Sequence, residues 1–232
     1  MNLLKFDISK IKPNNVVVYI GKTKSGKSFL VNDLLYQNRD LNIHNGLILS
    51  NSQNISDYIN LFPYNSICKP FSDDIIDDLI TNQININSDN IINQNSIQSS
   101  LLILDDIIDI NWTQSNSMKT CILNSKYYNI FSIITMQYCI LIPQNIRCNF
   151  DYVFILKEDI LSNLQILYNQ YFTIIPSFDI FCQVIDYYTK YYNCIVIDNT
   201  NNSNKIQDHI YWYKAMPHDI SYNPRKRKNQ DD

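Results

Sequence analysis

Short, continuously apolar runs recur along the chain, and helix-like stretches separate them. The apolar runs lie at 15–20, 46–50, 101–105, 131–136, 152–156 and 194–198, with a later strand-like run at 209–214. Runs without alternation are typical of strands covered on both faces, as in a parallel sheet. The helix-like stretches lie at 27–37, 72–82, 116–127, 158–172 and 177–190. This alternation predicts a three-layer α/β fold with a mostly parallel central sheet.

The length of the chain is suited to one domain with a large core. It has 232 residues, of which 45% are hydrophobic. We expect a single domain over 1–222 and a disordered tail over 223–232, "NPRKRKNQDD". The run 81–100 lacks Gly, Pro and aromatic residues, which predicts a surface insertion or a poorly ordered loop. The four cations of the tail are either simply solvated or form a local patch for DNA contact or nuclear import.

A glycine-containing segment follows the first predicted strand and opens the first predicted helix. Residues 21–28, "GKTKSGKS", fit the pattern GxxxxGK[ST] at every fixed position and hold two of the three glycines in the chain. Such a loop wraps its backbone N–H groups around a phosphate chain, at the positive end of the helix. The nucleotide-binding residues that it predicts are Gly21, Lys22, Thr23, Lys24, Ser25, Gly26, Lys27 and Ser28. The alternative is a turn that binds no ligand.

Within this loop two side chains have distinct chemical roles. We expect the Lys27 ammonium to reach the β- and γ-phosphates of a nucleotide and the Ser28 hydroxyl to ligate Mg²⁺. The loop therefore predicts binding of a nucleotide together with Mg²⁺.

A pair of acids ends the predicted strand "LLILDD" at 101–106. Open α/β sheets bind ligands at the carboxyl ends of their strands, which places Asp105 and Asp106 beside the loop. Asp105 is suited to the Mg²⁺ shell, and Asp106 to orienting and polarising an attacking water. Two adjacent acids favour hydrolysis over binding alone. The alternative is that they cap the following helix.

A polar residue ends the next predicted strand, in "SIITMQY" at 132–138. Gln137 is placed to hydrogen-bond both the γ-phosphate and the attacking water, and Thr135 is the alternative for this role. The remaining alternative is a polar strand end without a ligand.

Arginine is scarce, which narrows the source of extra positive charge for phosphoryl transfer. Outside the tail only Arg39 and Arg147 exist. Arg147 is the first candidate for an arginine finger supplied to a neighbouring subunit, or for a γ-phosphate reader; its alternative is a salt bridge to Asp151. Lys126 is the second candidate, and Arg39 fits a structural role at a helix end.

These motifs, in this order, resemble those of the DNA-packaging ATPases of nucleocytoplasmic large DNA viruses, the poxvirus-type branch of the FtsK/HerA superfamily. The resemblance runs from about 15 to 215. Besides the loop and "LLILDD", it rests on "FSIITMQYCILIPQNIRCNFDYVFIL" and on the C-terminal segment from "FDIFCQVIDYY" to "HIYWYKA". One departure stands out: the family pattern has an arginine where this chain has Lys126, which keeps the charge without the bidentate fork.

The resemblance implies a P-loop NTPase of the RecA-like type that hydrolyses ATP with Mg²⁺ and is stimulated by DNA. It implies a homo-oligomeric ring of five or six subunits that moves viral double-stranded DNA into a preformed capsid, with capsid proteins as further partners. It also implies that Lys27, Asp106 and Gln137 are catalytic residues, with Ser28 and Asp105 at the metal. The further catalytic cation is Arg147 or Lys126, and the departure at Lys126 favours Arg147. The expected location is the host cytoplasm, in the viral factory, with the virion as a second one.

Charge and cysteine content limit the remaining possibilities. The net charge is −3, so any DNA contact must be local. Six cysteines without a CxxC pair predict reduced thiols in an intracellular protein. A signal peptide and an apolar run of membrane-spanning length are both absent from the sequence, which argues against secretion and membrane insertion.

Two other functions stay open at this point. One is a P-loop nucleoside or nucleotide kinase, although such kinases use several arginines in a lid. The other is a nucleotide-binding scaffold for capsid assembly, against which Asp106 argues.

Overall fold

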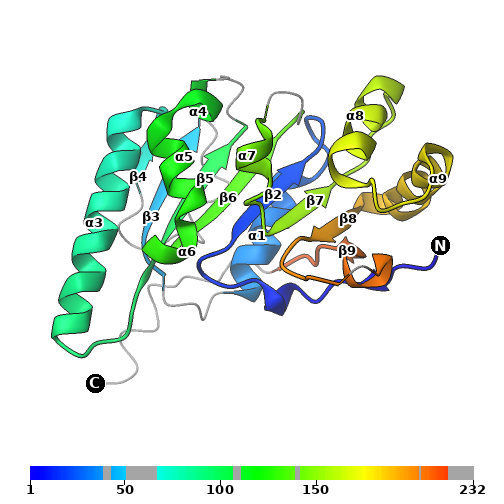
Figure 1. The fold of residues 1–232 in the computed structure, drawn as a ribbon. Helices are drawn as coiled ribbons and strands as arrows, with labels where there is room; N and C mark the ends of the chain where they lie inside the picture. Colours follow the sequence, from blue (N-terminus) through cyan, green and yellow to red (C-terminus); the bar gives the residue numbers. More distant parts are fainter. Residues whose placement is uncertain (39–42, 51–66, 107–110, 139–141, 204, 219–232) are drawn as a thin grey trace.

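One central sheet organises the part of the chain that the structure describes (Figure 1). This computed structural model describes all residues except 39–42, 51–66, 107–110, 139–141, 204 and 219–232. The strands are β1 (Leu4–Lys5), β2 (Val16–Ile20), β3 (Ile43–Ser50), β4 (Ile67–Lys69), β5 (Ser99–Asp105), β6 (Ile130–Met136), β7 (Tyr152–Ile155), β8 (Asn193–Asp198) and β9 (Ile210–Lys214). The α-helices are α1 (Lys27–Gln37), α3 (Asp73–Ile92), α4 (Asn111–Gln114), α5 (Asn116–Leu123), α6 (Ser125–Tyr128), α7 (Gln144–Arg147), α8 (Leu161–Tyr171) and α9 (Phe178–Tyr188). Short 3₁₀ turns are η1 (Ile8–Lys10), η2 (Lys190–Tyr192) and η3 (Ile206–Asp208).

The strand order is β1-β9-β8-β7-β2-β6-β5-β3-β4. All pairs from β7 to β4 are parallel, whereas β8 runs antiparallel to both β7 and β9. The predicted α/β fold with a mostly parallel sheet is confirmed. The strand β9 is second from one edge of the sheet because β1 pairs alongside it, with Leu4 opposite Tyr211.

Helices cover both faces of the sheet, which explains why the central strands are continuously apolar. Every residue of β2 is buried. Val17 and Tyr19 pack into the cluster that contains α1, and Val18 packs into the cluster that contains α5, α8 and α9. Figure 1 shows α1 behind the sheet and α3, α5, α8 and α9 in front of it. The three layers follow from this two-sided burial.

The polar run 81–100 differs from the expected loop. Residues up to Ile92 extend helix α3, and β5 begins at Ser99. The helix forms because Ile76, Ile80 and Gln83 place one face against the core. Gln83 is buried, and its amide donates to the Gln98 carbonyl at 2.6 Å. A buried glutamine with backbone and side-chain partners satisfies its polar groups, which composition alone does not reveal.

The parallel strands end at a common edge, called here the carboxyl edge. In register, Asp105 lies opposite Thr135, and Ile20 lies opposite both Met136 and Ile155. The residues that follow these strand ends therefore meet at one place. The basic tail over 223–232 lies outside the described residues.

Among the described residues, no helix has both the length and the apolar character that crossing a bilayer requires.

The cysteines whose side chains the structure describes are free thiols. They are Cys121, Cys148, Cys182 and Cys194. Burial raises the pKa of Cys121 to about 12, so this thiol stays protonated and unreactive at neutral pH.

The loop between β8 and β9 contains a titratable group whose effect on stability should depend on pH. His209 Nδ1 lies 2.9 Å from the Asp198 carbonyl oxygen, and Nε2 contacts the carbonyl oxygen of Ser203. Since both nitrogens face acceptors, the protonated ring is favoured. The Ser203 contact is the largest cause that raises the pKa of His209 above 6.5.

A raised pKa in the folded state stabilises the protein below the unfolded pKa, and this contribution is lost as pH rises through the folded pKa. We therefore expect His209→Gln to lower the free energy of unfolding more at about pH 5.5 than at about pH 8.5. Urea unfolding at both pH values measures this difference. Equal losses for His209→Gln at both pH values would contradict the assignment.

Candidate functional site

The loop 21–28 joins the end of β2 to the start of α1, and its two glycines are required by geometry. A Cβ on Gly21 would lie 2.7 Å from Ser25 Oγ and 2.8 Å from Leu156 Cβ, so no side chain fits there. Gly26 has φ 106°, a left-handed conformation that side chains disfavour. Glycine at these positions thus permits the backbone path that the sequence pattern predicted.

Lys27 is turned back into the loop. Its Nζ donates to the carbonyl oxygens of Gly21 at 2.7 Å and Lys22 at 3.3 Å, and the side chain is only 6% exposed. The same Nζ lies 3.3 Å from Asp106 Oδ1. The ammonium therefore stands between the loop and the acid pair.

The acid pair is held by Thr135 on the neighbouring strand β6. Thr135 Oγ1 donates to Asp105 Oδ1 at 2.8 Å and accepts from the Asp106 N–H at 2.9 Å. Asp106 itself has φ 44°, which turns the chain sharply after β5. Thr135, which the sequence offered as the alternative to Gln137, is buried; it orients the Asp105 carboxylate and holds the backbone of Asp106. Whether it also contacts a phosphate stays a prediction.

Gln137 follows β6 at the carboxyl edge and is partly exposed. It lines a small pocket together with Ile20, Tyr138, Glu158, Asn163, Ile166 and Leu167.

Glu158 is a carboxylate in this pocket that the sequence reasoning did not single out. Its Oε1 accepts from the backbone N–H groups of Asp159 and Ile160, at 2.8 and 2.9 Å, and Oε2 accepts from Asn163 Nδ2 at 2.9 Å. These bonds fix the carboxylate beside Gln137. The signal that could have revealed it is its place just after an apolar strand, in "YVFILKED".

Ion pairs connect the loop to the segment that follows β7. Lys22 Nζ lies 2.9 Å from Asp159 Oδ2, and Lys157 Nζ lies 3.2 Å from Asp159 Oδ1. The hydrogen bond from Lys22, followed by that from Lys157, lowers the pKa of Asp159. All three side chains are about half exposed, so each pair is weak on its own. The remaining loop residues Thr23 and Lys24 are exposed, and Lys24 has φ 62°.

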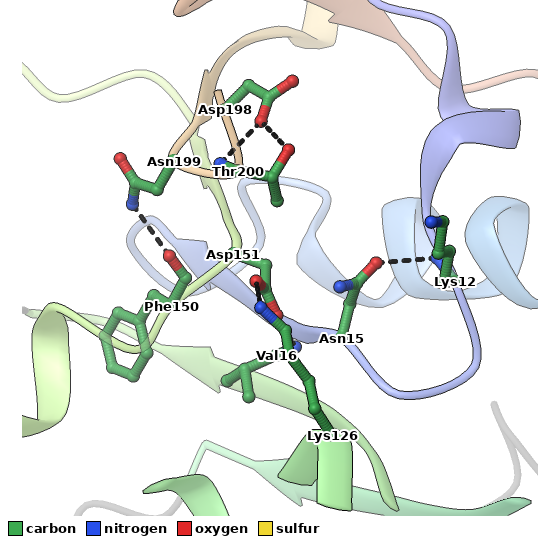
Figure 2. Close-up of polar contacts among 9 residues, drawn as sticks. All are labelled: Lys12, Asn15, Val16, Lys126, Phe150, Asp151, Asp198, Asn199 and Thr200. Carbon is green, nitrogen blue, oxygen red and sulfur yellow. Dashed lines mark hydrogen bonds and ion pairs between the residues drawn. The ribbon is translucent and has the colours of Figure 1, made fainter. Parts of the chain in front are cut away.

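Lys126 lies near the amino-terminal ends of the parallel strands, whereas the loop 21–28 (the P-loop) of its own chain lies at their carboxyl ends. It is 63% exposed, and its Nζ donates to Asp151 Oδ1 at 2.7 Å. Figure 2 shows Asp151 between Lys126 and Val16, whose N–H donates to Asp151 Oδ2 at 2.9 Å. Because Val16 begins β2 and the P-loop follows its other end, the length of the strand separates Lys126 from Lys27.

Arg147 does not take the Asp151 partner that was its alternative role, since Asp151 pairs with Lys126. Arg147 instead donates from Nη1 to the Ile142 carbonyl oxygen at 2.6 Å and is partly exposed. The structure thus gathers Lys27, Asp105 and Asp106 into one site, and it places Lys126 elsewhere. Arg39 lies outside the described residues.

Relatives of the whole chain occur in large DNA viruses. The chain is 30% identical to uncharacterized protein L437 of Acanthamoeba polyphaga mimivirus, over 98% of this chain and 82% of that protein. It is 31% identical to uncharacterized protein 075L of Invertebrate iridescent virus 6, over 86% of this chain and 76% of that protein. The chain belongs to the family of these viral proteins. No family model matches the chain.

Solved structures with the same fold include viral packaging ATPases. B204, the DNA-packaging ATPase of Sulfolobus turreted icosahedral virus, has a TM-score of 0.64 at 15% identity, over 89% of this chain and 100% of that chain. The genome packaging NTPase B204 of Sulfolobus turreted icosahedral virus 2, in complex with AMPPCP, has a TM-score of 0.61 at 13% identity, with the same coverage.

The cytoplasmic domain of the type VII secretion ATPase EccC of Thermomonospora curvata has a TM-score of 0.56 at 11% identity, over 92% of this chain and 27% of that chain. At these identities the likeness shows the fold, which is that of P-loop NTPases. Together with the viral relatives, it confirms the resemblance drawn from the sequence motifs.

The side chains at the ends of the loop and of β5 fit a complex of Mg²⁺ with a nucleotide. Mg²⁺ prefers oxygen ligands and is usually held by one or two protein groups plus substrate phosphates. Ser28, at the start of α1, offers a hydroxyl, and Asp105 offers a carboxylate that Thr135 orients. Ser28 and Asp105 would therefore hold the ion.

Proposed function

We propose that this protein is an ATP-hydrolysing motor that translocates viral double-stranded DNA into a capsid. The observation that carries the proposal is the meeting of Lys27 Nζ and Asp106 Oδ1, 3.3 Å apart, at the mouth of the P-loop. Phosphate-binding and water-activating groups thus adjoin each other. The viral relatives and the fold shared with B204, described as a DNA-packaging ATPase, support the link to packaging.

The residues of the site divide the work of hydrolysis among them. The backbone of 21–28 binds the phosphate chain, and Lys27 exchanges its contacts with the Gly21 and Lys22 carbonyls for phosphate oxygens. Mg²⁺, when bound, neutralises charge that develops on the phosphates. Asp106 orients the attacking water and accepts its proton, while Gln137 hydrogen-bonds the same water.

A further cation is proposed to come from a neighbouring copy in a homo-oligomeric ring of five or six subunits. Lys126 is exposed but lies at the opposite edge of the sheet from its own P-loop, so within one chain it cannot serve that site. Arg147, the first candidate from the sequence, has its guanidinium partly engaged by the Ile142 carbonyl. Either side chain is proposed to complete the site of the adjacent subunit, with capsid proteins as further partners.

The test combines turnover with particle size. We expect ATP hydrolysis by the purified chain to rise several-fold with duplex DNA, and we expect ring-sized particles by light scattering or electron microscopy with an ATP analogue and duplex DNA present. Phosphoryl transfer to a nucleoside would favour the kinase alternative instead. Assembly without any turnover would favour the scaffold, and a strict monomer under all conditions would contradict a cation supplied by a neighbour.

A further inference from the structure

Backbone strain gathers around the P-loop. Seven described residues have a left-handed φ, and five of these are Lys24, Gly26, Asp106, Tyr191 and Tyr192. The other two, Gln94 and Asn129, lie within two residues of the ends of helices α3 and α6. Bulky residues in this conformation are strained, and such strain tends to cluster at functional sites. Two consecutive tyrosines, with φ 56° and 61°, are therefore a feature that needs a reason.

Packing in the core does not explain the strained backbone, because neither tyrosine is buried. Tyr191 is 82% exposed and Tyr192 is 74% exposed. The pair stands between α9 and β8, where Thr189 is buried and its hydroxyl donates to the Ile185 carbonyl oxygen at 2.7 Å. The strained turn thus presents two aromatic rings to solvent from an anchored support.

The Tyr192 ring lies directly against the P-loop. A Cβ placed on Gly26 would be 3.6 Å from Tyr192 Cδ1, which is van der Waals distance.

The strand order gives the direction in which a bound nucleotide must extend. The acids and Gln137 follow β5 and β6 on one side of β2, whereas β7 and β8 lie on its other side. A triphosphate whose γ-phosphate points toward Asp106 must direct its nucleoside away from β5 and β6. Tyr191 and Tyr192, immediately before β8, stand on that second side.

We propose that Tyr192 is the stacking platform for the base of the bound nucleotide. The inference rests on the proposed nucleotide binding at the P-loop and deepens it by assigning the base subsite. Aromatic rings stack on bases through their π faces, and removal of such a ring weakens binding by roughly 10-fold or more. The P-loop would then bind the phosphates, and Tyr192 the base.

The experiment compares ATP with inorganic tripolyphosphate, which has the phosphates but no base. Tyr192→Asn removes the ring while asparagine tolerates a left-handed φ, so the backbone need not change. We expect this variant to bind ATP roughly 10-fold or more weakly and tripolyphosphate as tightly as the unaltered protein, by calorimetry. Tyr192→Phe should bind both ligands normally. Tyr127→Asn, at an exposed tyrosine on α6 at the opposite edge, is the matched control.

Each outcome has a distinct meaning. Unchanged ATP affinity in Tyr192→Asn would overturn the platform while leaving nucleotide binding at the P-loop intact. An equal loss of ATP and tripolyphosphate affinity would also overturn it, because the ring would then act through the loop. Failure of the unaltered protein to bind either ligand would instead contradict the proposed function itself.

Discussion

Lys27→Ala is expected to abolish nucleotide binding and hydrolysis, with a loss of at least about 100-fold in kcat/KM. The Lys27 ammonium lies at the mouth of the P-loop and contacts two loop carbonyls and Asp106. The Lys27 side chain is only 6% exposed. Without it, the phosphates lose their main side-chain cation. The Asp106 carboxylate also loses its counter-charge and would repel the γ-phosphate.

Calorimetric titration with an ATP analogue and a steady-state phosphate-release assay measure the two effects. Lys205→Ala is the matched control, because Lys205 is exposed and follows β8 at the opposite edge of the sheet. Lys27→Ala should keep most of its folding stability, because its partner Asp106 is 30% exposed and can be solvated. A Lys27→Ala protein that still hydrolyses ATP at a normal rate would remove the basis of the proposed site.

Asp106→Asn is expected to separate binding from chemistry. Asparagine has the shape of aspartate and tolerates the left-handed φ of 44°, so the N–H donated to Thr135 Oγ1 should keep its place. The amide cannot accept a proton from water. We therefore expect ATP affinity within a few-fold of normal and a fall in kcat of about 10²- to 10⁴-fold.

The matched control is Asp89→Asn, at an exposed carboxylate in the last turns of α3. If packaging or DNA-stimulated turnover were unchanged in Asp106→Asn, Asp106 would not be the water-activating group and the motor proposal would fail.

The same variant can locate the cation supplied by a neighbour. When subunits carrying Asp106→Asn are mixed with subunits carrying Arg147→Ala, some interfaces combine an intact Asp106 with an intact Arg147. Activity should then exceed that of either variant alone if Arg147 acts on the adjacent subunit. The parallel mixture with Lys126→Ala tests the second candidate, and a mixture that regains activity identifies the residue.

The sequence was sufficient for those parts of the site that are local in the chain. Gly21 and Gly26 can be recognised because the loop needs backbone without side chains over eight residues, and glycine is rare elsewhere in this chain. Asp105 and Asp106 can be placed at a strand end because a buried parallel strand is continuously apolar until it stops. Helix α1 was also predicted with its observed bounds, Lys27–Gln37.

Local patterns were misleading where long-range packing decides the outcome. The run 81–92 is helical because Gln83 finds partners on Gln98 and Ser100 across the molecule's core. The amino-acid composition of this run shows only that it is rich in asparagine, which is a poor helix former. Glu158 was likewise missed, since nothing in its neighbourhood shows that its strand ends beside Gln137.

What the sequence by itself determined is the kind of chemistry: a phosphate-binding loop, an acid pair and a polar strand end on an α/β scaffold. Only the tertiary structure decided which of these groups meet. Thr135 orients Asp105, Lys126 pairs with Asp151 at the far edge, and Tyr192 lies against Gly26. Such contacts join residues 25 to 166 positions apart in the chain. They depend on the strand order, which arises from how the apolar faces pack together rather than from any local pattern.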